Sequence, residues 1–324
     1  MSELYAGVDL GGTNVTCALA DGEGRIVATR KAPTRSVEPA KAVLERIAAM
    51  VTELADEAGR APAAVGMGIP GLVDRERGVT KFLPNFPTHW PDVPVREVLS
   101  DRLGCGIHIL NDVRTATLGE LTFGKGKGGR EKGLSMVFFA IGTGVGGGVV
   151  IDGRLRLGPL GAAGELGHHT MLPGGPLCGC GNRGCLETLA AGPAITAEGI
   201  RLMLSGMAPG LHELVGGDVS KVTTREMAAA AAAGDDAVRG AIVQAARWLG
   251  YGVANVVVTL HPELIVLGGG VAEIGPLYID TVEQTMRDAI GMFPTDGVRV
   301  TKSALGVQAG ILGAVALAKA GGDV

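Results

Sequence analysis

The sequence lacks a strong excess of charge of either sign. Its 324 residues include 29 Lys and Arg against 33 Asp and Glu, a formal net charge of −4. Proteins that bind nucleic acid or an anionic membrane surface through its charge usually carry a basic excess. The composition therefore gives no electrostatic reason to expect nucleic acid or a membrane as a partner.

Cysteines are few and odd in number. The chain has five, and Cys17 and Cys105 stand alone in the sequence, so there is no framework of paired cysteines. A strand-like segment begins at Leu4 and leaves no room for a signal peptide. We therefore expect a protein of the reducing cytoplasm.

The sequence also lacks a long uninterrupted apolar run. The uncharged stretch 134–151 approaches the length of a membrane span, but glycines 142, 144, 146, 147 and 148 break its centre. We interpret it as two buried strands joined by a glycine turn. The chain is 46% hydrophobic, enough for the cores of two domains or one large one.

Strand and helix patterns occur in two halves that share one plan. In the first half we expect strands at 4–10, 15–20 and 25–29, a helix at 39–58, and strands at 63–69 and 106–110. In the second half we expect the two strands of 134–151, a helix around 237–258, a strand at 264–267, a helix around 278–290 and a helix from about 309.

Three glycine-rich turns follow expected strands. Asp9-Leu-Gly11-Gly12-Thr13-Asn14 puts a carboxylate at a strand end and then bare backbone that can approach a phosphate. Gly142-Thr143-Gly144 repeats the device, and glycines 268–270 form a third turn. None has the Gly-Lys-Ser/Thr ending of a Walker loop. Alone, Gly11-Gly12 would equally suit an ordinary hairpin turn, but the three together favour one nucleotide held between two lobes.

One short window holds a candidate metal site. His168, Cys178, Cys180 and Cys185 supply the four Cys and His ligands of a structural zinc, in a loop too glycine-rich to hold itself. The alternative is a loop of unligated thiols. Glu165 and Glu187 stand at the two edges of the window, beside the expected metal site, where carboxylates could accept hydrogen bonds from hydroxyl groups of a polar ligand.

An Asn111-Asp112 pair follows the strand at 106–110. A carboxylate at a strand end is well placed to act as a general base for a hydroxyl that attacks a phosphoryl group. The alternative is that Asp112 caps a helix that starts near Val113, a common role for Asp after a strand.

These motifs together resemble the ROK family of sugar kinases, within the actin-like, hexokinase-like ATPase superfamily, over essentially the whole chain. The resemblance rests on Asp9-Leu-Gly-Gly-Thr-Asn14, Asn111-Asp112 with Leu118-Gly119-Glu120, Ile141-Gly-Thr-Gly-Val-Gly-Gly-Gly148, Glu165-Leu-Gly-His168 and Cys178-Gly-Cys-Gly-Asn-Arg-Gly-Cys-Leu-Glu187. It implies a two-lobed α/β fold of the actin-like/hexokinase (ribonuclease H-like) ATPase type, with duplicated βββαβαβα lobes and a zinc-stapled loop. The smaller lobe would be 1–112 completed by the C-terminal helix 306–324, and the larger lobe 113–305.

The resemblance also implies roles for individual residues. Asp112 would be the catalytic base, Asp9 would lie near a magnesium ion that arrives with ATP, and zinc would be structural. The residues expected to line the sugar are Gly71, Asn85, Asn111, Asp112, Glu165, His168 and Glu187. The residues expected around the nucleotide are Asp9, Gly11, Gly12, Thr13, Asn14, Gly142, Thr143, Gly144, Gly269 and Gly270. The expected zinc ligands are His168, Cys178, Cys180 and Cys185, with one imidazole nitrogen of His168 on zinc and the other facing the sugar.

The activity implied is ATP-dependent phosphorylation of the 6-hydroxyl of a hexose, an early step of glycolysis, by a cytoplasmic dimer or tetramer. The segment 82–90 resembles the loop of glucokinase-type members and favours glucose. Mannose, fructose, N-acetylglucosamine and N-acetylmannosamine stay open as substrates, as does polyphosphate as donor. A sugar-responsive repressor is a second hypothesis, although such members carry a helix-turn-helix ahead of the kinase-like part and the first glycine turn here already begins at Asp9. A sugar sensor without catalysis is a third.

The chain departs from the family pattern just after the Asn-Asp pair. Thr115 and Thr117 stand where the family more often has alanine, and Arg114 adds a charge. These differences concern the packing of the helix or a contact of the lobe, and they leave the expected base in place.

Overall fold

The computed structural model describes residues 3–324, which form two compact units. The first unit consists of the chain up to Leu134, Gly148–Gly164 and Ser303–Val324. The second unit consists of Ser135–Gly147 and Glu165–Lys302.

The first unit is built on a five-stranded sheet in the order β3-β2-β1-β4-β7. Its strands are β1 (Leu4–Leu10), β2 (Asn14–Asp21), β3 (Ile26–Pro33), β4 (Ala64–Ile69) and β7 (Gly106–Asn111). The first three form an antiparallel meander, whereas β4 and β7 run parallel to β1. The register pairs Asp9 with Gly68 and Ile69 with Asn111. Because parallel strands end at the same edge of a sheet, the residues that follow β1, β4 and β7 come together there.

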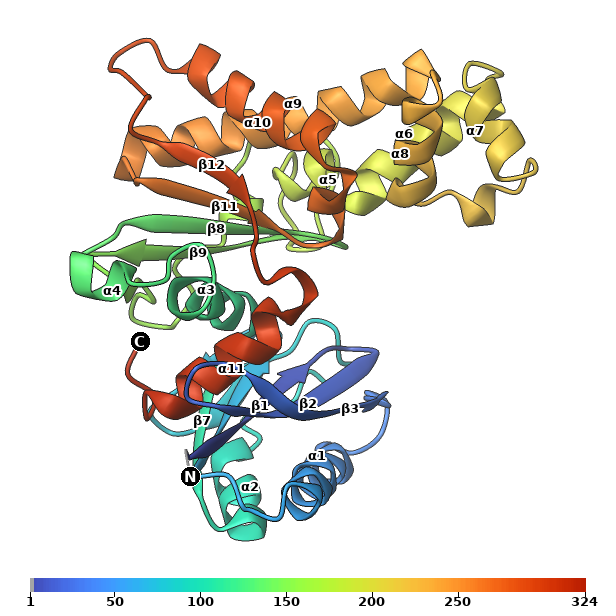
Figure 1. The fold of residues 1–324 in the computed structure, drawn as a ribbon. Coiled ribbons are helices and arrows are strands. Elements are labelled where there is room, and N and C mark those ends of the chain that lie inside the picture. Colours follow the sequence, from blue (N-terminus) through green and yellow to red (C-terminus); the bar gives the residue numbers. More distant parts are fainter. Residues whose placement is uncertain (1–2) are drawn as a thin grey trace. The chain divides into compact units, whose positions relative to one another are not determined.

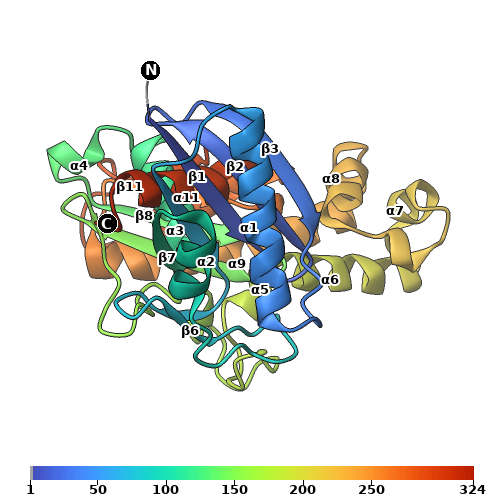
Figure 2. The same cartoon turned by 90° about the horizontal axis from the view of Figure 1, so that it is seen from below.

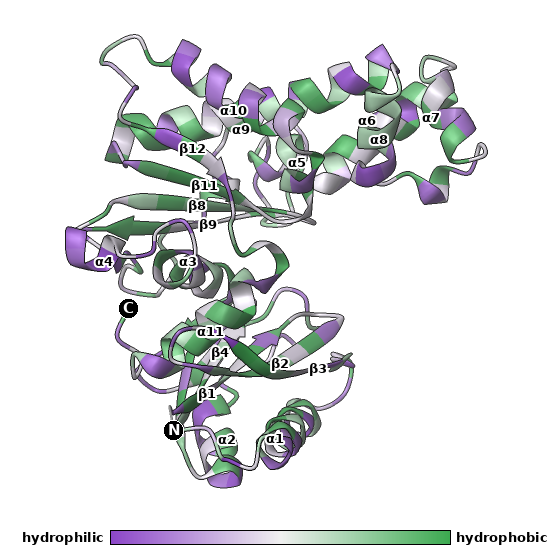
Figure 3. Cartoon of the chain, in the orientation of Figure 1, coloured by the Kyte–Doolittle hydropathy of each residue, from purple (hydrophilic) through white to green (hydrophobic). Residues whose placement is uncertain are grey.

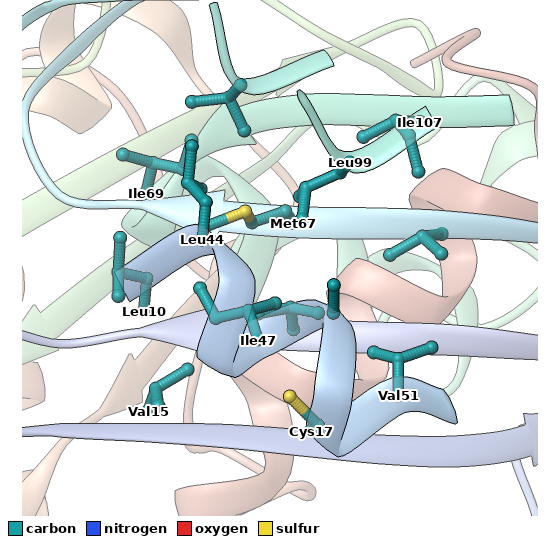
Figure 4. Packing of buried hydrophobic residues seen from close by; sticks show 14 of the residues in the cluster. Leu10, Val15, Cys17, Leu44, Ile47, Val51, Met67, Ile69, Leu99 and Ile107 are labelled. Carbon is teal, nitrogen blue, oxygen red and sulfur yellow. The ribbon is translucent and has the colours of Figure 1, made fainter. Parts of the chain in front are cut away.

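Helices cover both faces of this sheet. On one face lie α1 (Ala40–Glu57) and α2 (Val95–Leu103), and on the other lies α11 (Ala309–Lys319) (Figures 1 and 2). Helix α1 buries Leu44, Ile47 and Val51 at helical spacing, where they pack with strand residues such as Leu10 and Met67 (Figure 4). The helical spacing that predicted α1 is thus the spacing that fills this core.

The C-terminal helix α11 is apolar along nearly its whole length (Figure 3) and packs against the sheet and against α3 (Asp112–Thr122). The two helices approach so closely that a Cβ added to Gly313 would lie 1.7 Å from the carbonyl oxygen of Thr115. We expected the first lobe to end at residue 112. The compact unit instead continues to Leu134, because α3 packs on α11 within it.

The close contact between the two helices predicts a large penalty for one added methyl group. Gly313→Ala is expected to lower the free energy of unfolding by about 3 kcal/mol, because its Cβ would press on a backbone carbonyl that cannot turn away. Gly240→Ala is the matched control, since Gly240 is also helical but has no atom within 4 Å of an added Cβ. That variant should be more stable by about 0.5–1 kcal/mol. Urea unfolding of both variants tests the pair, and equal midpoints would contradict it.

The second five-stranded sheet repeats the plan of the first. Its order is β10-β9-β8-β11-β12. As in the first sheet, the strands that come third, second, first, fourth and fifth along the chain lie side by side in that order. Its strands are β8 (Met136–Ile141), β9 (Val145–Ile151), β10 (Arg154–Leu155), β11 (Leu264–Gly268) and β12 (Arg299–Lys302). The division between the units falls within β9, where a Cβ on Gly148 would lie 2.0 Å from Thr117 Oγ1 of α3. The duplicated βββαβαβα plan expected from the sequence is confirmed.

Long helices pack on the part of this sheet in the second unit. There α9 (Asp236–Leu260) and α10 (Pro276–Ala289) lie side by side (Figure 1). Within the described residues, α9 alone is long and apolar enough to cross a membrane by length and composition. However, 56% of its most apolar window is buried, and it packs against α6, α8 and α10. The burial of α9 is therefore typical of a helix in a protein core.

The remaining elements, like α2, β10 and β12 above, were not located from the sequence. They are the hairpin β5 (Leu72–Asp74) and β6 (Val79–Phe82), the helices α4 (Gly129–Lys132), α5 (Glu187–Ala190), α6 (Gly192–Leu204), α7 (Pro209–Leu214) and α8 (Thr224–Ala232), and the 3-10 turns Leu166–His168, Val219–Lys221, Gly270–Ile274 and Gly306–Gln308. Most are short, and short elements carry too few residues for a reliable period.

Candidate functional site

The turn between β1 and β2 is a tight hairpin turn that exposes Thr13 and Asn14 at its tip. The N–H of Gly11 donates to the carbonyl of Asn14 (2.9 Å), and the Thr34 hydroxyl donates to the carbonyl of Gly11 (2.6 Å). A Cβ added to Gly12 would lie 3.1 Å from the Cβ of Asn85. The missing side chain of Gly12 therefore allows Asn85 to lie directly beside the glycine turn.

Asp9 lies at the end of β1, half-buried, where a Cβ on Gly310 of α11 would come within 3.0 Å of its carboxylate. Burial raises the pKa of the Asp9 carboxyl. The charged form is therefore penalised by desolvation, and a cation nearby would relieve that penalty.

The turn from β7 into α3 carries the Asn111-Asp112 pair. Asn111 caps the helix, because its Oδ1 accepts from the N–H groups of Val113 (3.0 Å) and Arg114 (3.2 Å). Its Nδ2 donates to the carbonyl of Gly71 (3.0 Å), which follows β4. Asp112 stands in the first helical turn, and its Oδ1 also accepts from Val113 N–H (2.9 Å). The N-cap position thus falls to Asn111 and not to Asp112.

Gly71 has a conformation that favours glycine. Its φ is +88°, and a Cβ there would lie 2.2 Å from the carbonyl oxygen of Phe82. The first unit therefore brings Asp9, the first glycine turn, Gly71, Asn85 and the Asn111-Asp112 pair to one edge of its sheet, as the strand order requires.

The second glycine turn joins β8 to β9 in the second unit. Gly142 N–H donates to the carbonyl of Gly144 (2.9 Å), and Gly192 N–H at the start of α6 donates to the carbonyl of Gly142 (2.8 Å). Gly269 has φ +85°, and a Cβ there would lie 2.3 Å from the carbonyl oxygen of Ile141. Gly270 follows it and is exposed. The glycines that follow β8 and β11, with the N-terminus of α6, therefore lie close together.

Glu187 links this turn to the cysteine-rich loop. Its Oε2 accepts from Val145 N–H (3.0 Å), and a Cβ on Gly144 would lie 2.3 Å from that oxygen. Its Oε1 accepts from the Cys178 thiol (3.5 Å). One carboxylate thus contacts both the second glycine turn and the expected metal cluster.

The four expected metal ligands lie together. One ligand atom from each of His168, Cys178, Cys180 and Cys185 falls within 4.8 Å of all the others. The Sγ atoms of Cys180 and Cys185 are 3.7 Å apart, and Cys178 Sγ is 3.6 Å from His168 Nδ1.

These distances match a tetrahedral zinc site. Zn–S bonds of about 2.3 Å and Zn–N bonds of about 2.0 Å in a tetrahedron put two sulfurs about 3.8 Å apart and a sulfur and a nitrogen about 3.5 Å apart. Burial raises the pKa of the Cys178 and Cys185 thiols, whereas a backbone hydrogen bond at Asn182 lowers that of Cys180. Two buried thiols become good ligands only where a cation compensates their charge, so the Cys3His cluster fits a structural zinc.

Two buried charged residues of α3 have contacts that sequence reasoning missed. The Glu120 carboxylate accepts from the Ser303 hydroxyl, from Leu305 N–H (2.9 Å) and from Lys125 N–H (2.9 Å). Arg114 appeared in the sequence only as an added charge, yet it is 1% exposed. The only sign of this burial in the sequence was a charged residue inside the expected helix, and that sign did not show which groups Arg114 contacts.

The fold and the site define the class of protein: two sheets of one βββαβαβα plan, each with a glycine turn after its first strand, characterise the actin-like, hexokinase-like ATPase fold. The ROK family model matches residues 5–321, and the chain belongs to the ROK family.

Relatives of this family are similar over nearly the full chain. The glucokinase of Streptomyces coelicolor is 34% identical and that of Thermotoga maritima 35% identical, with 98% and 97% of this chain aligned to 98% and 96% of theirs. Among solved structures, a ROK family glucokinase from Streptomyces griseus in complex with glucose and AMPPNP has a TM-score of 0.84 at 33% identity. That alignment covers 98% of this chain and 99% of the relative.

Proposed function

We propose that this protein is an ATP-dependent glucokinase that transfers the γ-phosphoryl group of ATP to the 6-hydroxyl of glucose. The observation that carries the proposal is the turn at the end of β7, where Asn111 serves as helix cap and Asp112 places its carboxylate at the first turn of α3. Full-length relatives that are glucokinases, and a similar structure that binds glucose and AMPPNP, support the same activity.

In this proposal Asp112 is the general base. It accepts the proton of the 6-hydroxyl as that oxygen attacks the γ-phosphorus, while the bond from phosphorus to the leaving oxygen of ADP breaks. The other residues proposed to bind the sugar are Gly71, Asn85, Asn111, Glu165, His168 and Glu187. Carboxylate and amide oxygens accept the hydroxyl hydrogens of a polyol, and amide N–H groups donate to its oxygens.

The two glycine turns are proposed to bind the phosphates. Thr13 and Asn14 in the first turn and Thr143 in the second add polar side chains to bare backbone, with Gly269 and Gly270 beside the second turn. Asp9 would hold the magnesium ion that accompanies ATP, which would relieve the desolvation that raises the pKa of its carboxyl. Bound magnesium would neutralise charge on the phosphates.

Zinc has a structural part in this proposal. The Nδ1 atom of His168 faces the cluster, so its Nε2 is the atom that can meet a sugar hydroxyl. Zinc would thus fix the orientation of one sugar contact without touching the phosphates. Cytoplasmic location, a place in glycolysis and a homodimer or homotetramer complete the proposal.

The test is ADP release from Mg-ATP with glucose, mannose, fructose, N-acetylglucosamine and N-acetylmannosamine, each against a control without sugar. We expect the largest kcat/KM with glucose. A larger kcat/KM with another of these sugars would support the proposed kinase activity but would show that glucose is not the preferred substrate. Release with none of them, together with glucose binding in calorimetry, would replace the enzyme with a sugar sensor or with a kinase for another donor such as polyphosphate.

A further inference from the structure

Arg114 is a buried guanidinium in the first turn of α3 with a specific set of acceptors. Its Nη1 donates to Asn111 Oδ1 (3.1 Å) and its Nε to the carbonyl of Ala163 (3.1 Å). Its Nη2 donates to the carbonyls of Ala162 (3.2 Å) and Ala163 (2.9 Å). Four hydrogen bonds therefore leave one side chain toward two segments that are far apart in sequence, both within the first unit.

The first of these segments is the Asn111-Asp112 turn. Oδ1 of Asn111 accepts three N–H groups, from Val113, from the Arg114 backbone and from the Arg114 side chain. Three donors on one oxygen determine which way the amide faces, so its Nδ2 is directed to Gly71. Arg114 thus contributes to the orientation of a residue proposed to bind the sugar.

The second segment is the loop 157–164, which leads directly into Glu165. Gly158, Gly161 and Gly164 all have positive φ, at +69°, +70° and +95°. Such a glycine-rich loop loses much conformational entropy when it is ordered. Two backbone hydrogen bonds lie within it, from Ala163 N–H to the carbonyl of Leu157 (2.9 Å) and from Gly161 N–H to the carbonyl of Gly158 (3.2 Å). The guanidinium fork binds the same end of the loop through two adjacent carbonyls.

Burying a cation costs free energy unless the cation is fully hydrogen-bonded, so the burial of the Arg114 guanidinium depends on these acceptors. Because Arg presents a planar fork, it can join one side-chain oxygen and two backbone carbonyls, which the single ammonium of Lys cannot do with the same geometry. In the sequence, Arg114 is a departure from the family pattern that concerns the packing of the helix or a contact of the lobe, and the structure shows which contact it makes.

We infer that Arg114 is a positioning residue for sugar binding: it holds the 157–164 loop, which enters Glu165, against the turn that carries Asn111 and Asp112. The inference rests on the proposed function, since it assigns Arg114 to the sugar part of the site and not to the nucleotide part. Its loss should therefore affect the two substrates unequally.

The experiment measures KM for glucose and for ATP, kcat and hydrogen exchange of the loop in wild type, Arg114→Lys and Thr117→Ala. Thr117 is the matched control: it is buried and polar on the same helix, but its hydroxyl donates to the carbonyl of Val113 within the helix (2.7 Å). We expect Arg114→Lys to raise the glucose KM by about 10- to 100-fold with the ATP KM unchanged within about twofold. The Ala163 amide should exchange faster, and Thr117→Ala should keep both KM values.

Other results would overturn the inference. Faster loop exchange with an unchanged glucose KM would make Arg114 a purely structural residue, and an equal rise in both KM values would remove its link to the sugar. If Arg114→Lys does not fold, Arg114→Gln carries the same test, because the glutamine side chain is neutral and does not itself bury a charge. Absence of turnover in wild type would defeat the proposed function separately. The glucose Kd from calorimetry would then replace KM in the same comparison, and absence of binding would defeat the inference too.

Discussion

Asp112→Asn is expected to lower turnover of glucose by about 10²- to 10⁴-fold while the protein stays folded and binds sugar. Asparagine has nearly the shape of aspartate but cannot accept a proton at neutral pH. The hydrogen bond from Val113 N–H to Oδ1 can persist in the variant, and the cap of α3 is made by Asn111. The loss should therefore fall on kcat and leave the helix in place.

The measurements are steady-state ADP release and the glucose Kd by calorimetry. Asp101→Asn is the control, because Asp101 is an exposed carboxylate on α2 and its change removes the same charge from the same unit. The control should keep wild-type turnover. Near-normal turnover of Asp112→Asn would mean that another group is the base, and loss of glucose binding would mean that Asp112 acts mainly in binding.

Cys180→Ser is expected to lose bound zinc and to weaken glucose binding together. A serine hydroxyl is almost never ionised at neutral pH, so it replaces a thiolate ligand poorly, and three remaining ligands leave the tetrahedron open. The loop around Cys178 and Cys185 would then lose its main constraint. Nδ1 of His168, which faces the cluster, would lose the proposed metal, and Nε2 would lose the orientation that the proposed sugar contact requires.

Elemental analysis of zinc per chain and calorimetry with glucose check this prediction. Cys105→Ser is the matched control, since Cys105 is a half-buried cysteine of the first unit that lies outside the four-ligand cluster. It should keep its zinc and its glucose affinity. A Cys180→Ser protein that retains stoichiometric zinc would sink the four-ligand assignment, whereas zinc loss with unchanged sugar affinity would separate the metal from the sugar contact.

Much of the fold could be predicted because the strongly periodic elements carry their own signal. The apolar residues of α1 recur at helical spacing and are the residues that fill the core, and the apolar strands β1, β4 and β8 are bounded by glycine turns. The hairpin β5-β6 and helices α6 to α8 were not predicted, because their patterns are short or are decided by packing against one another and, for α6 and α8, against the distant helix α9. The close approach of α3 and α11 was not predicted either, because the sequence does not show which backbone carbonyl packs against a glycine such as Gly313.

The sequence by itself determined the chemistry that is local: the glycine turns, the spacing of His168 and the three cysteines, and the Asn-Asp pair at a strand end. Such motifs are readable because the residues that act together are also close along the chain. Only the tertiary structure decided that Asn111 and not Asp112 caps α3, that Glu187 contacts both a glycine turn and Cys178, and that Arg114 binds a loop some fifty positions away. The physical reason is that a buried polar group must find its partner wherever the fold brings an acceptor, and that partner is set by the packing of distant segments.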